Sequence, residues 1–172
     1  MKRVSILNDV LGPVMRGPSS SHTAAPFFIG TIAHALLGEE PASVAFAFDP
    51  KGSFAQVYRQ QGSDLGFASG LMGLPIKDES FPRALELAAE KGVGIKFVIE
   101  PLPDADHPNT VEIRMVAQSG RRLSLSAQSI GGGAFQFIRL DRWPVLLTGN
   151  AHELLIEMRT DAESAVLKSL KR

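Results

Sequence analysis

Apolar residues recur at helical spacing in the first half of the chain. Within residues 24–37, Phe28, Ile32 and Leu36 follow one another at intervals of four, and Gly38 comes next as a helix stop. By this reasoning, helices are expected over residues 24–37, 64–72 and 81–91. The second is rich in small residues, so it could pack closely on another backbone. Ser80 is the expected N-cap of the third.

The second half of the chain alternates apolar and polar residues instead. Val111, Ile113 and Met115 alternate with Glu112 and Arg114, which predicts a half-buried antiparallel strand. Further strands are expected over residues 44–48, 95–99, 123–130, 135–140 and 145–147, while 53–58 fits a strand or a short helix. The pattern therefore predicts an α+β fold, in which an antiparallel or mixed sheet is covered by helices.

The last residues do not fit into that sheet. Residues 152–159 are typical of a strand, and Thr160-Asp161-Ala162-Glu163 fits the capping box of a final helix. One strand and one helix cannot bury much core of their own. We therefore expect one domain over residues 1–150. The strand-helix fragment over 151–172 would then start a second domain or pack on a partner.

Composition narrows the function classes. The chain has 172 residues, with 18 Lys and Arg against 18 Asp and Glu, so its formal net charge is zero. It lacks the excess of basic residues that is typical of nucleic-acid binding. No apolar run approaches the ~18–20 residues needed to cross a bilayer, and the amino terminus does not fit a signal peptide. We expect a cytoplasmic protein that binds neither nucleic acid nor membrane.

The cysteine count is zero. This excludes disulfides, a cysteine nucleophile, thiolate zinc sites and any iron–sulfur cluster held by the chain's own cysteines. The His, Asp and Glu residues also lack metal-ligand spacing. The chain is therefore not expected to bind a metal by itself.

The densest group of chemically capable side chains is Ser19-Ser20-Ser21-His22-Thr23, at the start of the first predicted helix. Unpaired N–H groups and the helix dipole favour an anion at such a position, and an imidazole can move a proton near neutral pH. A substrate carboxylate or phosphate would fit there. The alternative is a serine-rich cap beside a surface histidine. The residues alone weigh the two about equally, although three serines exceed what capping needs.

Two further segments carry weaker signals. Gly131-Gly132-Gly133 permits close approach by a ligand, yet a bulge or wide turn explains it more simply. His107-Pro108-Asn109-Thr110 places an imidazole and an amide on a stiff loop, yet Asn109 could simply make a turn hydrogen bond. Ser53 and Asp64 are weaker candidates still.

Taken in order, these segments are similar to those of a known family. The resemblance is carried by Gly12-Pro13-Val14-Met15, Gly17-Pro18-Ser19-Ser20-Ser21-His22-Thr23, Gly52-Ser53-Phe54-Ala55, His107-Pro108-Asn109-Thr110 and Ser129-Ile130-Gly131-Gly132-Gly133. Over residues 4–150 the chain resembles the beta subunit, or beta domain, of the iron–sulfur-dependent bacterial L-serine dehydratases.

The resemblance implies an activity, a cofactor and a partner. Members convert L-serine to pyruvate and ammonia with a [4Fe–4S] cluster, whose cysteines lie on the alpha subunit or domain. This chain would then be a beta subunit, active only with an alpha subunit. The implied fold is similar to the allosteric substrate-binding domain of phosphoglycerate dehydrogenases, and residues 151–172 would begin a truncated ACT-like regulatory domain. Self-association is equally compatible with the sequence.

The resemblance also implies roles for individual residues. His22 and Thr23 would be catalytic, with His22 moving or orienting a proton. The substrate-binding residues would be Ser19, Ser20, Ser21, Asn109, Gly131, Gly132 and Gly133, and no residue would bind metal.

One segment departs from the family. Members usually carry a Lys-Gly-His-x-Thr-Asp-like stretch where this chain has Arg59-Gln60-Gln61-Gly62-Ser63-Asp64, so Gln61 replaces a histidine. Glutamine can hydrogen bond but cannot titrate. Three interpretations stay open: the histidine is dispensable, the substrate differs, or the chain is a divergent, inactive paralogue. The competing function is a stand-alone module that binds an amino or hydroxy acid.

Overall fold

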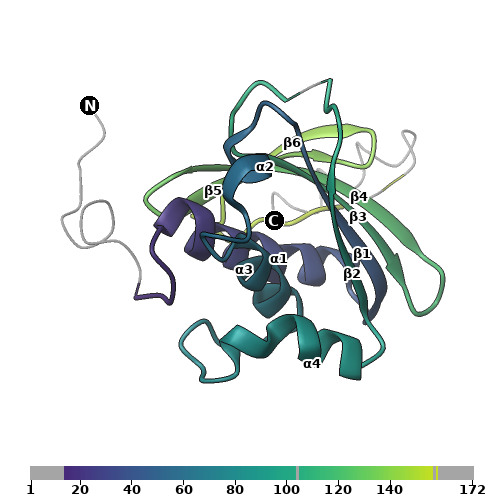
Figure 1. Cartoon of the computed structure of the whole chain (residues 1–172). Helices are drawn as coiled ribbons and strands as arrows, with labels where there is room; N and C mark the ends of the chain where they lie inside the picture. Colours follow the sequence, from purple (N-terminus) through teal and green to yellow (C-terminus); the bar gives the residue numbers. More distant parts are fainter. Residues whose placement is uncertain (1–13, 104, 157, 159–172) are drawn as a thin grey trace.

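A mixed sheet of six strands organises the computed structural model, which describes residues 14–103, 105–156 and 158. The strand order is β2-β1-β3-β4-β5-β6; β1 and β2 run parallel, and every other neighbouring pair is antiparallel. The strands are β1 (Pro41–Phe48), β2 (Gly94–Ile99), β3 (Thr110–Ala117), β4 (Arg122–Gly131), β5 (Ala134–Leu140) and β6 (Trp143–Leu147). Helices cover one face of this sheet (Figure 1), so the expected α+β fold is confirmed.

Four α-helices accompany the sheet in the described part of the chain. They are α1 (Ala25–Leu37), α2 (Ser53–Val57), α3 (Ser63–Leu71) and α4 (Ala84–Glu90). A five-residue π-helical turn, Ser20–Ala24, leads into α1, and a 3₁₀ turn, Phe81–Arg83, leads into α4. Among the residues described, no helix has the length and apolar character needed to span a bilayer.

Phenylalanine rings fill the space between the sheet and its helices. Phe46 and Phe48 of β1 are fully buried, and Phe46 stacks on Phe67 of α3 with ring centroids 4.6 Å apart. Phe48 also contacts Phe54 of α2, with centroids 5.3 Å apart. Because these large apolar side chains share one core, the short helix α2 is held against the end of β1.

Helices α1 and α3 touch through their backbones. A Cβ atom at Gly70 would lie 1.9 Å from the Phe27 carbonyl oxygen, and one at Gly66 would lie 2.6 Å from the Thr23 carbonyl oxygen. Only glycine permits such an approach. The prediction that this helix packs closely on another backbone is therefore confirmed, and the contact fixes the turn 20–24 against the start of α3.

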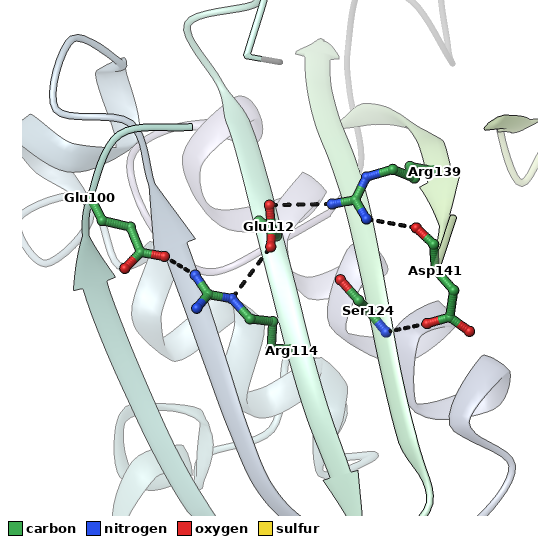
Figure 2. Close-up of polar contacts among 6 residues, drawn as sticks. All are labelled: Glu100, Glu112, Arg114, Ser124, Arg139 and Asp141. Atoms are coloured by element: carbon green, nitrogen blue, oxygen red, sulfur yellow. Dashed lines mark hydrogen bonds and ion pairs between the residues drawn. The ribbon is translucent and has the colours of Figure 1, made fainter. Parts of the chain in front are cut away.

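The other face of the sheet carries charged side chains (Figure 2). Arg114 pairs with Glu100 and with Glu112, and Glu112 pairs in turn with Arg139 at 3.2 Å. These four residues are called the ion-pair ladder below. Their side chains are 27–45% exposed, so the ladder is in contact with water.

Two local expectations differ from the structure, and one alternative is decided. Ser80 makes no side-chain cap bond, because it already adopts helical dihedral angles where an N-cap residue is extended. Residues 152–156 form no regular strand. Residues 53–57 are helical rather than extended. The final helix predicted from 160 onward and the motif residues Gly12 and Pro13 lie outside the described residues, and the division at residue 150 stays a prediction.

Candidate functional site

Four segments that are far apart in the sequence meet at one end of the sheet. Strands β1, β2 and β4 end there and β3 begins there, as their registers require. The Ser129 hydroxyl donates to the Ser21 carbonyl at 2.9 Å, and the Ser129 N–H donates to the Asn109 carbonyl at 3.1 Å. These bonds join the turn 20–24, the loop 107–110 and the end of β4. Together with Ser53, we call this region the His22 site.

His22 is the central side chain of the site. It is 9% exposed, with Nε2 3.0 Å from Ser53 Oγ and Nδ1 3.3 Å from Ser19 Oγ. The Phe54 ring packs edge-on against the imidazole, with centroids 5.4 Å apart. Burial lowers the pKa of His22, because desolvation disfavours the charged imidazolium. The imidazole is therefore neutral at pH 7 and able to accept a proton.

The structure does not fit the alternative of a serine-rich cap beside a surface histidine. His22 is buried, and Ser19 makes no side-chain capping bond; its hydroxyl faces the imidazole instead. The turn starts from the main chain, since the Ser19 carbonyl accepts the Thr23 N–H at 2.8 Å. Ser20 and Ser21 are half-buried in the same turn. The segment therefore places the Ser19 hydroxyl beside a buried imidazole, with Ser20 and Ser21 in the same turn.

Thr23 is fully buried and anchors a loop. Its Oγ1 donates to the Gln61 carbonyl at 2.8 Å. The acceptor belongs to the main chain, so this bond does not depend on which side chain stands at position 61. The Thr23 hydroxyl therefore holds the loop before α3 against the turn 20–24.

Asn109 carries a buried acceptor without a donor among the described residues. Its Oδ1 has no hydrogen-bond partner, whereas its main-chain N–H donates to His107 Nδ1 at 3.1 Å. A buried acceptor left unpaired costs ~1–3 kcal/mol. A hydrogen-bond donor that reaches this oxygen would remove the cost.

The glycine run forms the hairpin between β4 and β5. Gly131 pairs with Ala134, and the two residues between them, Gly132 and Gly133, have φ values of 63° and 86°. Two consecutive positive φ angles are typical of a tight hairpin turn and favour glycine. A register shift also falls between Ser129 and Gly131. The expected bulge is therefore present, but the turn is narrow rather than wide.

Sequence reasoning underrated two residues that the structure places in or beside the site. Ser53 contacts the imidazole directly. Burial raises the pKa of Asp64, at the start of α3. Nearby, the Ser63 hydroxyl is buried without a hydrogen-bond partner among the described residues. From the sequence, Ser53 and Asp64 were only weak candidates, since neither spacing nor periodicity singles them out.

His22 does not line either of two hollows on the described surface. These hollows measure about 490 and 500 Å³. The first lies over the open face of the sheet between Ser43 and Asp141. The second lies beyond Gly52 and Pro108, on the loop 101–108.

The residues of this chain do not fit as ligands of an iron–sulfur cluster. Such clusters are held mainly by cysteine thiolates, and the chain has no cysteine. Among the described residues, no group of three His, Asp or Glu side chains is placed to hold a metal ion.

Two curated proteins are similar to this chain. The "Probable L-serine dehydratase, beta chain" of Bacillus subtilis (strain 168) is 38% identical over 148 residues, which cover 86% of this chain and 66% of that protein. The "L-serine dehydratase, beta chain" of Peptoniphilus asaccharolyticus is 32% identical over 149 residues, which cover 87% of this chain and 66% of that protein. This chain thus spans just under two thirds of the length of these relatives.

No protein-family model matches the chain. The two relatives nevertheless align with 86% and 87% of this chain, at 38% and 32% identity. This agrees with the resemblance carried by the segments that the fold brings together. The chain belongs to the L-serine dehydratase beta-chain family.

Proposed function

We propose that this chain is the beta subunit of a two-chain L-serine dehydratase, which converts L-serine to pyruvate and ammonia. One observation carries the proposal: the family's separate segments converge on a buried, neutral His22. The names of the two relatives supply the substrate. In the net reaction, loss of a proton from Cα and of the hydroxyl from Cβ as water gives 2-aminoacrylate. This enamine takes up a proton at Cβ to become an imine, which water hydrolyses to pyruvate and ammonia.

In this proposal His22 holds or moves the proton. Its lowered pKa keeps the imidazole neutral near pH 7, as a proton acceptor must be. The hydroxyls and nearby main-chain N–H groups of Ser19, Ser20 and Ser21 hold the substrate carboxylate. The unpaired Asn109 Oδ1 accepts a hydrogen bond from the substrate ammonium.

Thr23 and the glycine turn would position other parts of the site and would not take part in proton transfer. The Thr23 hydroxyl is committed to the Gln61 carbonyl, so we assign it to holding the site together rather than to proton transfer. Gly131, Gly132 and Gly133 would shape or close the pocket next to Ser129.

A partner chain would complete the active site. This chain has no cysteine to ligate a cluster, and no group of three His, Asp or Glu side chains in its described part is placed to hold a metal ion. We therefore place the [4Fe–4S] cluster on an alpha subunit, where it would act as a Lewis acid toward the substrate hydroxyl.

Glutamine at position 61, in place of the family's histidine, is compatible with the fold that this assignment requires. Its main-chain carbonyl makes the bond to Thr23, and its side chain is half-buried. The replacement therefore preserves the loop and removes only a titratable group. Turnover of the assembled enzyme with L-serine decides among a dispensable histidine, a different substrate and an inactive paralogue.

The test is anaerobic co-expression with a cysteine-bearing alpha chain, followed by an assay of pyruvate from L-serine. We expect His22→Ala to lower turnover by about 10²–10⁴-fold, the usual contribution of general acid–base catalysis. His34→Ala is the matched control, because His34 lies in the last turn of α1, with its Nε2 3.9 Å from Glu40 Oε1. Near-normal turnover of His22→Ala would contradict the proposal. Binding of L-serine by this chain alone, without turnover in the complex, would favour the binding module.

A further inference from the structure

We propose that Ser53 is the positioning residue of His22: it accepts the Nε2–H of the imidazole and leaves Nδ1 as the nitrogen that exchanges a proton. This inference rests on the proposed function, in which His22 moves the proton. It assigns a role to a serine that lies 31 residues from the histidine it contacts.

The position of Ser53 is fixed by the main chain. Its N–H donates to the Pro108 carbonyl at 2.7 Å. A Cβ atom at the preceding Gly52 would lie 2.8 Å from the same carbonyl oxygen, so the start of α2 and the loop 107–110 are in direct backbone contact. The main chain of Ser53 is therefore held in place by contacts that do not involve His22, and the Ser53 hydroxyl reaches Nε2 of His22 from that position.

The residue after Ser53 holds the plane of the imidazole. Phe54 is fully buried, packs against Phe48 and Phe67, and meets the His22 ring edge-on. The Ser53 hydroxyl and the Phe54 ring together restrict the orientation of the imidazole. Turning the ring over would exchange its nitrogens for carbons and break the contacts with both Ser53 and Ser19.

The two distances indicate which nitrogen is anchored. Nitrogen–oxygen hydrogen bonds usually measure about 2.7–3.2 Å. The 3.0 Å contact of Nε2 with Ser53 lies within that range, whereas the 3.3 Å contact of Nδ1 with Ser19 lies just beyond it. A neutral imidazole carries one proton and one free lone pair. With the proton on Nε2, the lone pair of Nδ1 faces the serine turn, where the substrate would bind.

The first test reads the imidazole directly. Two-dimensional ¹H–¹⁵N NMR on the full chain at pH 7.5, with the His22 signals assigned by loss in His22→Gln, reports which nitrogen carries the proton. We expect the Nε2–H form in the unsubstituted chain, with a proton protected from solvent exchange. Ser53→Ala should remove that protection, and Ser53→Thr should keep it. The Nδ1–H form, or identical signals in Ser53→Ala, would overturn the inference.

The second test is a double-mutant cycle in the assembled two-chain enzyme. Ser53→Ala should lower kcat by about 10–100-fold, the scale expected when a reacting group is misplaced, with little change in KM. Ser53→Thr should recover most of the rate. In a His22→Ala background, Ser53→Ala should add no further loss, whereas independent losses would overturn the positioning role.

The matched control is Ser69→Ala. Ser69 is also a serine of a helix, and its hydroxyl donates to the Leu74 carbonyl at 3.0 Å, near the end of α3. We expect this variant to keep both the His22 signals and kcat. The two readouts distinguish failure of the proposed function from failure of this inference. If His22→Ala keeps its turnover, the proposed function is wrong. If the His22 signals are unchanged in Ser53→Ala, only the role of Ser53 is wrong.

Discussion

Two polar regions of this molecule are built in opposite ways. The His22 site consists of neutral groups, and its central imidazole is 9% exposed with a hydroxyl near each ring nitrogen. The ion-pair ladder on the open face consists of full charges whose side chains are 27–45% exposed. Both are chains of polar contacts across several strands or loops, yet the central imidazole of the first is far more buried than the charged side chains of the second.

The difference shows where polar contacts matter for structure. Removing one partner of a buried hydrogen bond leaves the other unsatisfied, which costs ~1–3 kcal/mol. Exposed ion pairs contribute only ~0.2–1 kcal/mol because water and salt screen them. The neutral bonds of the His22 site should therefore fix geometry, while the ladder should be replaceable. The predictions below test that ranking, from the largest expected effect to the smallest.

Gly70→Ala should have the largest effect on stability, because it disrupts the contact between α1 and α3 that holds the His22 site in place. The new Cβ would lie 1.9 Å from the Phe27 carbonyl oxygen, so α1 and α3 must separate and move the turn 20–24. We expect a loss of about 3 kcal/mol or more in the free energy of unfolding, measured by urea denaturation. Gly94→Ala is the control, because its Cβ would meet only ordinary contacts. Equal losses in both variants would show that the helix contact has no special role.

Thr23→Val should cost about 1–2 kcal/mol, because it removes the donor to the Gln61 carbonyl inside the packed site. Thr31→Val is matched to it: that hydroxyl also donates to a main-chain carbonyl, Phe27, but at an exposed position. We expect a much smaller change there. Similar urea midpoints for the two variants would break the distinction between buried and exposed bonds.

Acid should weaken the fold through His22. The pKa of His22 in the folded chain lies below the ordinary value of 6.5. Below pH 6.5, His22 therefore binds a proton more readily in the unfolded chain than in the folded chain. Stability from this group is fully present above pH 6.5 and is lost as pH falls toward the folded pKa. Burial raises the pKa of Asp64, which acts in the opposite direction at lower pH. Urea midpoints from pH 7.5 to 5.5 should therefore fall less in His22→Gln than in the unsubstituted chain. A His34→Gln control with the same flattening would contradict the assignment.

Glu112→Gln should have the smallest effect, although it breaks two contacts of the ladder. We expect a loss of no more than about 1 kcal/mol, and less in 1 M salt, because exposed pairs are weak and screened. The measurement is urea denaturation at two salt concentrations. A loss larger than that of Thr23→Val would reverse the ranking of the two regions.

Much of the fold could be predicted from local patterns. The alternation of Val111, Ile113 and Met115 with Glu112 and Arg114 identified β3 and both of its faces, because side chains of a strand point alternately to opposite sides. The small residues of α3 predicted a close backbone contact, which Gly66 and Gly70 make. Helix starts were harder, as Ser80 shows, because capping depends on dihedral angles that composition does not fix.

By itself, the sequence determined the α+β class and the lack of thiolate ligands, and it singled out the serine-histidine turn as a candidate site, because periodicity, composition and local motifs are properties of neighbouring residues. Only the tertiary structure decided that His22 is buried, that Ser53 and Ser19 stand near its two nitrogens, and that Ser129 ties Ser21 to the site. Those contacts join residues far apart in the chain, and they depend on strand register and on the close approach of α1 and α3. The same packing removes water from the imidazole, which lowers its pKa and makes it suited to accept a proton.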